Sequence, residues 1–479
     1  MNELKMETKK EAKTASLHNL GCKVNAYEMD VMEELLRENG YRIVPFTEPA
    51  DVVIINTCTV TNIADRKSRQ MLHRAKKQNP DGVVVAVGCY VQTGLEEALK
   101  DAGIDLCIGN NKKGELVQLL SEYLGLKTLR EADKTLGNRS VIDVNGGCEY
   151  EDMQLKKISE HTRAYIKIQD GCNQFCTYCI IPYARGRVRS RRPEEILKEV
   201  RGLAEAGCRE FVVTGIHISS YGYDLVHPDK KPMANQFHEE SLLQLLQAME
   251  EIPGVERIRL GSLEPRIITQ AFVQGLAAMK TICPHFHLSL QSGSDTVLRR
   301  MNRQYTTADF ARCVERLREA FDRPAITTDI IVGFPGETEE EFAQTLAFAE
   351  QIGFYEMHIF KYSKRKGTPA ATMPGQLTEA QKAERSDRLE ALEKQLSAAF
   401  RRDRTGSECE VLFEEFQQIA GKNYLAGHTR EYIRVAVESS GDLSGQIRTV
   451  RLGAELTDGI LQGVTIHSPS CCDSNGGCQ

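Results

Sequence analysis

The sequence lacks the features that would place it in a membrane, outside the cell or among disulfide scaffolds. It has no run of about 18 apolar residues, so no membrane span is expected. The first residues are polar and carry no apolar segment, so no secretory signal is expected either. Its 15 cysteines among 479 residues are too few for a disulfide scaffold. We therefore expect a cytoplasmic protein, in which clustered cysteines bind metal or take part in chemistry.

An excess of positive charge is also lacking. The formal net charge is −6, so any nucleic-acid binding has to come from local basic patches. Two segments carry arginine and lysine without any acid: 66–77, with six such residues, and 185–192, with five arginines. A third segment, 361–366, adds four more basic residues. Ordinary solvated surfaces are the alternative, but three patches downstream of strand ends favour contact with phosphates.

Three segments differ in pattern, as about 150 residues per domain would suggest. Residues 14–130 alternate apolar runs with helical stretches, which predicts a Rossmann-like parallel sheet. After a polar linker at 131–160, residues 161–400 repeat the strand–helix unit six times. Because eight units close the common barrel, six predict an open (β/α)6 barrel. Short strands at 404–467 predict a small β-barrel, and 468–479 form a tail.

Helix signals and a long loop complete the predicted barrel. Pro193 stands near the start of one helix, and Thr338 with Glu341 forms a capping box at another. Residues 222–240 predict a long loop, and the charged stretch 378–402 predicts the last barrel helix. The six expected strands share apolar runs that end in small or polar residues, at 163–169, 210–215, 257–262, 285–291, 325–333 and 355–363.

The stretch "DGCNQFCTYC" places Cys172, Cys176 and Cys179 directly after the first predicted barrel strand. Ligands collect at this end of the strands in βα barrels. Thiolates at this density suit a 4Fe-4S cluster, and three ligands leave one iron open to an exogenous ligand. A zinc site completed by a distant residue, or a structural cluster with a remote fourth ligand, remains an alternative.

A second cysteine set is spread over the first segment. Cys22, Cys58 and Cys89 each stand at the end of one predicted strand. Since ligands bind outside the carboxyl ends of parallel strands, the three thiols predict another three-ligand site. Buried, unreactive cysteine is the alternative for any one of them. No site is assigned to the remaining cysteines, Cys107, Cys148, Cys208, Cys283, Cys313, Cys409, Cys471, Cys472 and Cys478.

The C-x₃-C-x₂-C motif on the first loop of a βα barrel resembles the radical S-adenosylmethionine (SAM) enzymes. The resemblance implies that the amino and carboxylate groups of SAM hold the open iron. Tyr178 matches the position that contacts adenine in that superfamily. Further rim residues are candidate SAM contacts: Gly215, Ser262, Glu264, Gln291, Arg303, Val332 and Gly333. Arg303 is a candidate partner of the SAM carboxylate. Val332 and Gly333 lie on a stretch that resembles the adenine-contacting strand of the superfamily.

The motifs "GCKVN", "NTCTV" and "VGCY" before the barrel, with a β-barrel after it, resemble the methylthiotransferases over roughly 14–467. This resemblance implies a second 4Fe-4S cluster on Cys22, Cys58 and Cys89 and a C-terminal TRAM domain that contacts RNA. "LGCKVNAYE" is most similar to the branch that modifies threonylcarbamoyladenosine next to the tRNA anticodon. Relatives acting on isopentenyladenosine or on an aspartate of a ribosomal protein are alternatives, as is a non-enzymatic iron–sulfur or RNA-binding protein.

The implied reaction is a radical one. An external donor such as a flavodoxin reduces the cluster, SAM is cleaved, and the radical removes hydrogen from C2 of adenine; sulfur comes from the second cluster and the methyl group from another SAM. Both clusters then have to face one cavity that admits the anticodon stem-loop of tRNA. The terminal segment is net acidic, so RNA contact there is expected from a local face formed by Arg430, Arg434, Arg448 and Arg451.

Overall fold

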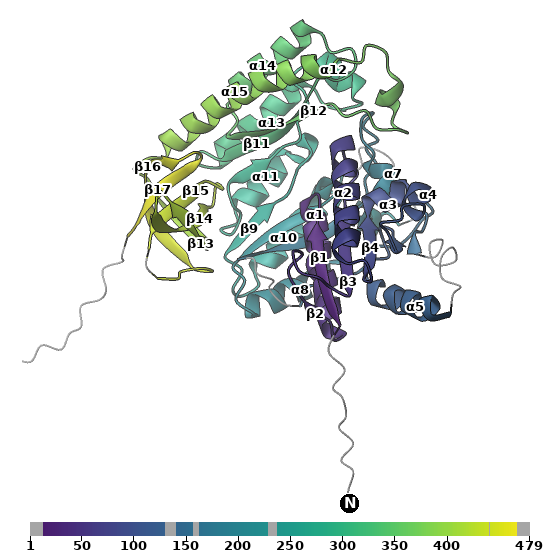
Figure 1. Cartoon of the computed structure of the whole chain (residues 1–479). Coiled ribbons are helices and arrows are strands. Elements are labelled where there is room, and N and C mark those ends of the chain that lie inside the picture. Colours follow the sequence, from purple (N-terminus) through teal and green to yellow (C-terminus); the bar gives the residue numbers. More distant parts are fainter. Residues whose placement is uncertain (1–12, 130–139, 157–161, 229–236, 440, 467–479) are drawn as a thin grey trace, which may run out of the picture.

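The computed structural model describes residues 13–129, 140–156, 162–228, 237–439 and 441–466. Its strands form an N-terminal parallel sheet, a central set of parallel strands and a closed C-terminal barrel. The purple N-terminal lobe lies against the teal and green central barrel, and the long helix α15 leads to the yellow C-terminal barrel (Figure 1). The mixed α/β fold with a terminal small barrel is confirmed.

The N-terminal lobe is a five-stranded parallel sheet in the order β2-β1-β3-β4-β5. Its strands are β1 (Thr14–Asn19), β2 (Arg42–Ile43), β3 (Val52–Thr57), β4 (Val83–Gly88) and β5 (Leu106–Ile108). Its helices are α1 (Lys23–Glu38), α2 (Asn62–Gln78), α3 (Cys89–Thr93), α4 (Leu95–Leu99) and α5 (Leu116–Leu129). Every residue of β3 and β4 is buried, as expected for apolar strands covered on both faces.

The central barrel contains the six predicted parallel strands. They are β6 (Arg163–Asp170), β8 (Glu210–Gly215), β9 (Arg257–Leu260), β10 (His285–His287), β11 (Ala325–Val332) and β12 (Glu356–Lys361). Parallel bridges between Ile258 and Ile282 and between Leu263 and Leu288 join β9 to the β10 region. The short strand β7 (Arg189–Ser190), which the sequence did not predict, pairs antiparallel with β6. In the described strands β7 and β12 form the free edges, so the barrel is open.

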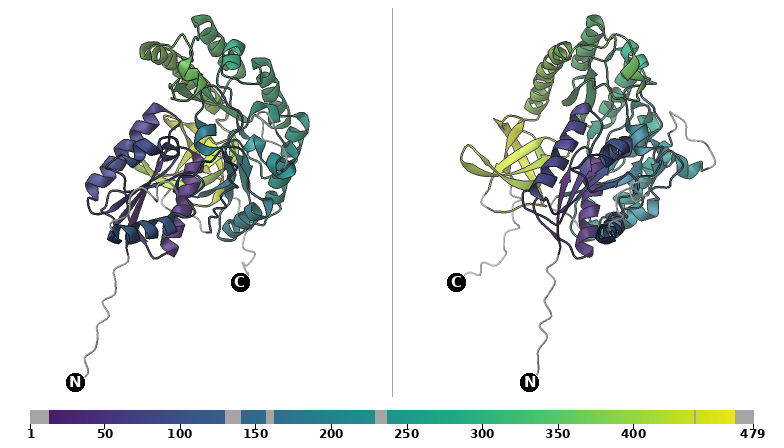
Figure 2. Two further views of the ribbon diagram at one scale, coloured as in Figure 1. Left: turned by 90° about the vertical axis from the view of Figure 1, so that its right-hand side faces the viewer. Right: turned by 45° about the vertical axis from the view of Figure 1, so that its right-hand side comes forward.

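Helices form an arc outside these strands (Figure 2). They are α7 (Ile181–Arg185), α8 (Pro193–Glu205), α9 (Tyr223–Val226), α10 (Glu239–Glu250), α11 (Gln270–Ala277), α12 (Asp295–Arg300), α13 (Thr307–Ala320), α14 (Glu339–Ile352) and α15 (Glu379–Asp403). Pro193 begins α8, and Thr338 and Glu341 form the capping box of α14, as predicted. The predicted loop at 222–240 contains the short helix α9, and its residues 229–236 lie outside the described part.

Five strands close the C-terminal barrel in the order β13-β14-β15-β17-β16. They are β13 (Glu408–Ile419), β14 (Lys422–Thr429), β15 (Arg434–Glu438), β16 (Ile447–Thr457) and β17 (Ile460–Thr465). The sequence did not predict β14. Arg257 and Arg259 of β9 donate hydrogen bonds to backbone oxygens of this barrel, at Glu410, His428, Thr429 and Arg430. The C-terminal barrel is therefore tied to the starts of the central strands.

The described part of the predicted linker packs between the two α/β lobes. Residues 141–156 form neither helix nor strand, but Met153 and Leu155 are buried in the main core. The Tyr27 hydroxyl of α1 donates to the Met153 carbonyl, and Glu199 of α8 accepts from the Leu155 amide. Two apolar side chains thus make this segment part of the lobe interface. The division of the chain at the predicted boundaries remains a prediction.

No helix among the described residues is long and apolar enough to cross a membrane.

Candidate active site

A cavity of about 640 Å³ lies where the N-terminal lobe meets the rim of the central barrel. Cys22 lines it from the N-terminal lobe, and Cys172, Cys176 and Cys179 line it from the barrel. The carboxyl ends of β8, β9 and β10 supply further lining residues. The structure therefore brings one member of the dispersed cysteine set and the whole contiguous set to one chamber.

The dispersed set converges because its strands are neighbours in the sheet. Cys22 precedes α1, Cys58 follows β3, and Cys89 begins α3 directly after β4. Gly21 has φ of +115°, and a Cβ there would lie 3.2 Å from the Cys58 sulfur. Burial, together with the nearby Cys89 and Cys22, raises the pKa of Cys58 to about 11. These thiols lie close enough to interact, as the sequence predicted.

The contiguous set lies on the loop after β6. Gly171 turns the chain with φ of +72°, where any Cβ would meet the Arg187 carbonyl oxygen at 1.9 Å. Burial raises the pKa of Cys172 to about 12 and also raises the pKa of Cys179. The Arg303 guanidinium donates to the Cys176 sulfur at 3.2 Å and to the Ser289 carbonyl at 3.3 Å. A half-buried cation thus faces the thiols, where it favours thiolate.

The donor chemistry fits iron–sulfur clusters. Among the described residues, one group of potential metal ligands has its donor atoms all within 4.8 Å, and it contains no cysteine. Each triad is therefore wider than a pocket for one ion, which suits a multi-iron cluster better than zinc. Burial holds several of these thiols neutral, and metal coordination would supply the charge that stabilises the thiolates.

The predicted SAM contacts fall into two groups. Six of the eight line the cavity: Tyr178, Gly215, Ser262, Glu264, Gln291 and Arg303. Val332 and Gly333 are outside its lining. Val332 is fully buried in the main core, and a Cβ on Gly333 would meet Lys382 of α15 at 2.5 Å. The SAM role of all eight residues remains a prediction.

The basic segment 185–192 is largely buried, which contradicts its predicted contact with phosphates. Arg185, Arg189 and Arg191 are at most 6% exposed. Arg185 pairs with Glu28 of α1 and with Asp170 of β6 at 2.9 and 3.1 Å. These arginines neutralise buried carboxylates from other segments, and such partners are invisible in the local sequence. Within this segment the side chains of Arg187 and Arg192 remain exposed.

The other two basic segments form one surface. Arg66, Lys67 and Lys77 of α2 are exposed, as are Lys361 at the end of β12 and Lys364 and Lys366 after it. Asn62 at the start of α2 joins the two segments: its amide donates to Ser363 at 3.0 Å, and its side chain donates to the Lys364 carbonyl at 3.0 Å. We call this joined surface the α2 basic face. Arg365 is buried and pairs with Asp65 at 2.7 Å.

The predicted RNA face of the C-terminal barrel is largely engaged in protein contacts. Arg430 donates to the Lys280 and Ile282 carbonyls of the central barrel, which contradicts its RNA role. Arg434 pairs with Glu415 and Arg451 with Glu408, each at 2.7 Å, and Arg448 donates to Gln446. This barrel therefore offers RNA fewer free cations than the α2 basic face.

Sequence reasoning missed five ionisable residues that line the cavity: Lys23, His217, His287, Asp329 and His358. Burial lowers the pKa of His217 to about 3, so its ring is neutral. Its Nδ1 bonds Ser220 at 2.8 Å, while its buried Nε2 has no partner among the described residues. The available signal was polar residues at alternate positions of otherwise apolar strands, as in "HFH" and "MHI".

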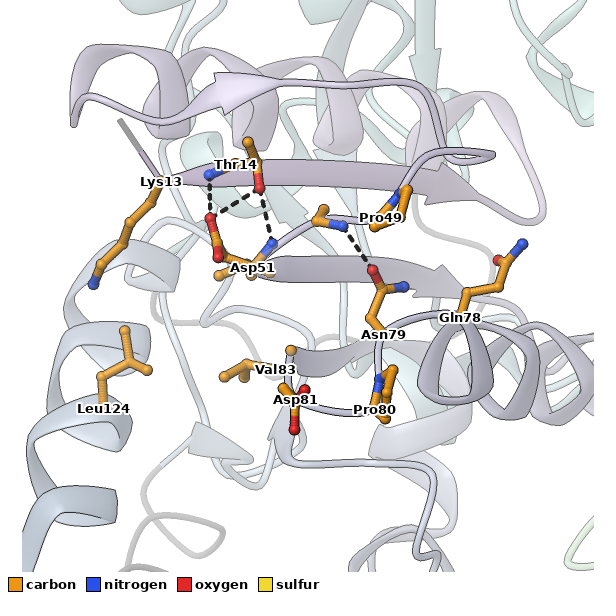
Figure 3. Close-up of a pocket in the computed structure, with 13 residues that line it drawn as sticks. Lys13, Thr14, Pro49, Asp51, Gln78, Asn79, Pro80, Asp81, Val83 and Leu124 are labelled. Atoms are coloured by element: carbon orange, nitrogen blue, oxygen red, sulfur yellow. Dashed lines mark hydrogen bonds between the residues drawn. The ribbon is translucent and has the colours of Figure 1, made fainter. Parts of the chain in front are cut away.

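A second cavity, of about 470 Å³, lies at the opposite edge of the N-terminal sheet (Figure 3). The side chains of Thr14, Asp51 and Asn79 are engaged in local structure. Asp51 accepts hydrogen bonds from the Thr14 amide and hydroxyl, and Asn79 accepts from the Ala50 amide. It lies at the amino ends of β1, β3 and β4, where ligands of parallel sheets do not collect.

Comparison with known proteins identifies two families along the chain. Residues 166–349 match the radical SAM superfamily, and residues 14–109 match uncharacterized protein family UPF0004. A solved radical S-adenosylmethionine methyltransferase, TsrM from Kitasatospora setae, shares the fold with a TM-score of 0.53 and 15% identity, over 75% of this chain and 74% of that one.

Curated relatives match over nearly the whole chain. The threonylcarbamoyladenosine tRNA methylthiotransferase MtaB of Bacillus subtilis is 41% identical over 92% of this chain and 93% of its own. The protein of that name from Aquifex aeolicus is 37% identical over 86% and 95%. A tRNA-2-methylthio-N(6)-dimethylallyladenosine synthase of Caldicellulosiruptor saccharolyticus is 36% identical over 92% and 90%. The chain therefore belongs to the radical SAM methylthiotransferase family.

Proposed function

We propose that this protein inserts a methylthio group at C2 of N6-threonylcarbamoyladenosine next to the anticodon of tRNA. The observation that carries the proposal is the shared chamber, in which Cys22 of one lobe faces Cys172, Cys176 and Cys179 of the other. A reaction that joins sulfur to a carbon radical needs both sites at one substrate atom. The relatives named for threonylcarbamoyladenosine support this choice of base.

The residues fit two 4Fe-4S clusters, one held by Cys172, Cys176 and Cys179 and the other by Cys22, Cys58 and Cys89. When bound, the clusters and SAM supply the radical that removes hydrogen from C2, the sulfur and the methyl group. Arg303 holds its guanidinium against Cys176 and offers positive charge to the SAM carboxylate. The neutral ring of His217 offers a hydrogen-bonding nitrogen to the chamber without adding charge.

The α2 basic face is the proposed binding surface for the anticodon stem-loop. Val60, which lines the chamber, lies between Cys58 and the start of α2, so the basic face begins at the chamber. Val60 and Ile63 are 47% and 53% exposed there and offer apolar contact to unstacked bases. Phosphates along the stem-loop then meet Arg66 and Lys67, while the target base enters the chamber.

An external one-electron donor such as a flavodoxin is part of the proposal, because no residue of the chain supplies low-potential electrons. A site of action in the cytoplasm, where tRNA is modified, is proposed as well.

The test is nucleoside analysis after anaerobic reconstitution with iron and sulfide. The protein is incubated with SAM, dithionite and tRNA that carries threonylcarbamoyladenosine but no methylthio group. We expect the 2-methylthio nucleoside together with 5′-deoxyadenosine. Cleavage of SAM without any change to the tRNA would contradict the proposal.

One observation supports isopentenyladenosine as an alternative substrate, namely the 36% identity to the dimethylallyladenosine synthase. Equal amounts of the two tRNAs in one reaction decide between them. We expect product on the threonylcarbamoyl tRNA alone, and product on isopentenyladenosine would assign the other branch. A ribosomal protein added as a third substrate tests the aspartate-modifying alternative.

A further inference from the structure

Four polar side chains meet inside the chamber and have no part in holding the proposed clusters. Lys23 stands at the start of α1, and His287, Asp329 and His358 lie on β10, β11 and β12. One donor atom from each of the last three lies within 4.8 Å of the others. The rings of His287 and His358 stack with centroids 5.6 Å apart, and His287 Nε2 lies 3.3 Å from Asp329 Oδ2.

His287 lies deeper in the barrel than the rim residue Ser289. His287 precedes Ser289 by two positions, and residues two apart in a strand face the same side about 7 Å apart. Below it, the ring of His285 stacks on Tyr432 of the C-terminal barrel with centroids 5.1 Å apart. His287 therefore lies between the rim, where the cysteines are, and the contact that His285 makes with the C-terminal barrel.

Positive charge dominates the surroundings of the group. Desolvation lowers the pKa of Lys23, as do the charges of Arg259 and Arg163, whereas the acids Asp329 and Glu210 raise it. Glu210 is already held by three arginines, at 2.8 Å from Arg259 and 3.6 and 3.7 Å from Arg257 and Arg163. Asp329 is then the one carboxylate in the chamber that faces Lys23 without an arginine partner among the described residues. Such a site favours an anion over a divalent cation.

Some of the donors and acceptors in the group have no hydrogen-bond or ion-pair partner among the described residues. The Nδ1 of His287 is hydrogen-bonded to the Thr327 hydroxyl at 3.0 Å, whereas its Nε2 lies 3.3 Å from Asp329 Oδ2 without a hydrogen bond among the described residues. His358 has no hydrogen bond among the described residues, and Lys23 forms no ion pair within 4.0 Å there. Both face the cavity. The group thus presents an ammonium and an imidazole as donors beside the Asp329 carboxylate, which lies close to His287.

We propose that Lys23 and His358 bind the carboxylate of the threonyl substituent on the substrate base, and that Asp329, which lies beside His287, accepts a hydrogen bond from its hydroxyl. The inference rests on the proposed function and deepens it. A carboxylate and a hydroxyl on one small group match this pattern of two donors and one acceptor. The chamber thereby selects an amino-acid substituent over an apolar one, which would leave these polar groups unpaired.

The experiment uses full-length reconstituted protein and two RNA hairpins. One hairpin carries threonylcarbamoyladenosine, and the other carries the same base with its carboxylate converted to the methyl amide. For the wild type we expect a KM roughly 10- to 100-fold lower with the carboxylate, as a charge-assisted hydrogen bond gives. Lys23→Gln should lose this preference, whereas Lys100→Gln on the N-terminal surface should keep it. Binding of both hairpins to cluster-free protein gives a second readout.

His358→Gln serves as the second variant, because Lys23 adjoins Cys22 and its replacement can disturb the proposed second cluster. A partial loss of the preference in His358→Gln supports the proposal, and an unchanged preference in both variants overturns it. A raised SAM requirement for 5′-deoxyadenosine formation without RNA, in either variant, would assign the carboxylate to the cofactor. Zinc bound by the wild type and lost in His358→Gln would make the group a metal site. Either result overturns the proposal.

The experiment can contradict the carboxylate site without contradicting the proposed function. A wild type that modifies neither hairpin contradicts the proposed function and this inference together. A wild type that modifies both hairpins equally well leaves the proposed function standing and overturns the carboxylate site alone.

Discussion

The two cysteine triads reach the same chamber by different routes. Cys172, Cys176 and Cys179 belong to one loop, and their spacing alone places them together. Cys22, Cys58 and Cys89 are brought together by the order of β1, β3 and β4 in the sheet and by the absence of a side chain at Gly21. A contiguous site is encoded locally, whereas a dispersed site depends on the packing of a whole lobe.

Removing one cysteine from each triad separates their roles and has the largest expected effect. Cys176→Ala should abolish SAM cleavage, and Cys89→Ala should retain it but lower methylthio product by more than about 100-fold. Each variant should drop from about eight irons to about four. Iron analysis and quantified 5′-deoxyadenosine check this, with Cys208→Ala as control for a buried cysteine outside both triads. Loss of SAM cleavage in Cys89→Ala would show that the triads do not act separately.

The buried charges that join the two lobes provide the next test. Glu28 of α1 pairs with Lys167 at 2.7 Å, with Arg185 at 2.9 Å and with Lys113. Arg185 also donates to Asn25 at 2.7 Å, beside Cys22. Glu28→Gln leaves buried cations unpaired and should cost about 3–5 kcal/mol in the free energy of unfolding. Urea unfolding measures it.

The surface pair Glu33–Arg37 supplies the matched control, since Glu33→Gln should cost at most about 1 kcal/mol. Equal losses in the two variants would mean that the buried charges do not join the lobes energetically.

The junction with the C-terminal barrel should respond to acid. Burial would raise the pKa of Glu210, but Arg259, followed by Arg163 and Arg257, lowers it to about 2. A folded pKa below the unfolded value of about 4.5 gives stability that is complete above pH 4.5 and is lost as pH falls toward 2. The shift corresponds to roughly 3 kcal/mol.

Glu210→Gln should therefore destabilise the protein at pH 7 and flatten the acid limb of its stability profile. Unfolding by urea between pH 2 and pH 7 measures both effects. An unchanged acid limb would assign that limb to other carboxylates.

The smallest effect is expected on the α2 basic face. The double variant Arg66→Gln, Lys67→Gln should weaken tRNA binding several-fold and reduce the slope of log affinity against log salt by about 1 to 2. Stability should not change, because both side chains are exposed. The double variant Lys198→Gln, Arg312→Gln, on the outer barrel helices, is the control. Equal salt slopes in the two would remove this face from the RNA-binding surface.

Much of the fold could be predicted because its signals are local. Apolar runs marked the six central strands, and Pro193 and Thr338 marked helix starts. Strand β14 escaped because "KNYLAGHT" begins with polar residues and contains a glycine. That Gly427 is required by packing, since a Cβ there would lie 2.1 Å from the Leu412 carbonyl oxygen.

The site was predictable where residue type alone defined it and not where partners did. The cysteines could be predicted from their spacing or from their position after strands. The predicted phosphate contact of Arg185 and Arg191 was wrong because their acidic partners, Glu28 and Glu199, lie on other elements. Lys23, His287, Asp329 and His358 were missed because four segments far apart in sequence meet only in the folded barrel.

Arg365 connects the two lobes that enclose the chamber. Its guanidinium, 7% exposed, joins the central barrel to Asp65, Thr59 and Asn62 of the N-terminal lobe. A hinge motion of one lobe away from the other would have to break these buried contacts at every turnover. We therefore expect the two lobes to stay together during turnover, so that the target nucleotide of the proposed substrate has to leave its own RNA stack to enter the chamber.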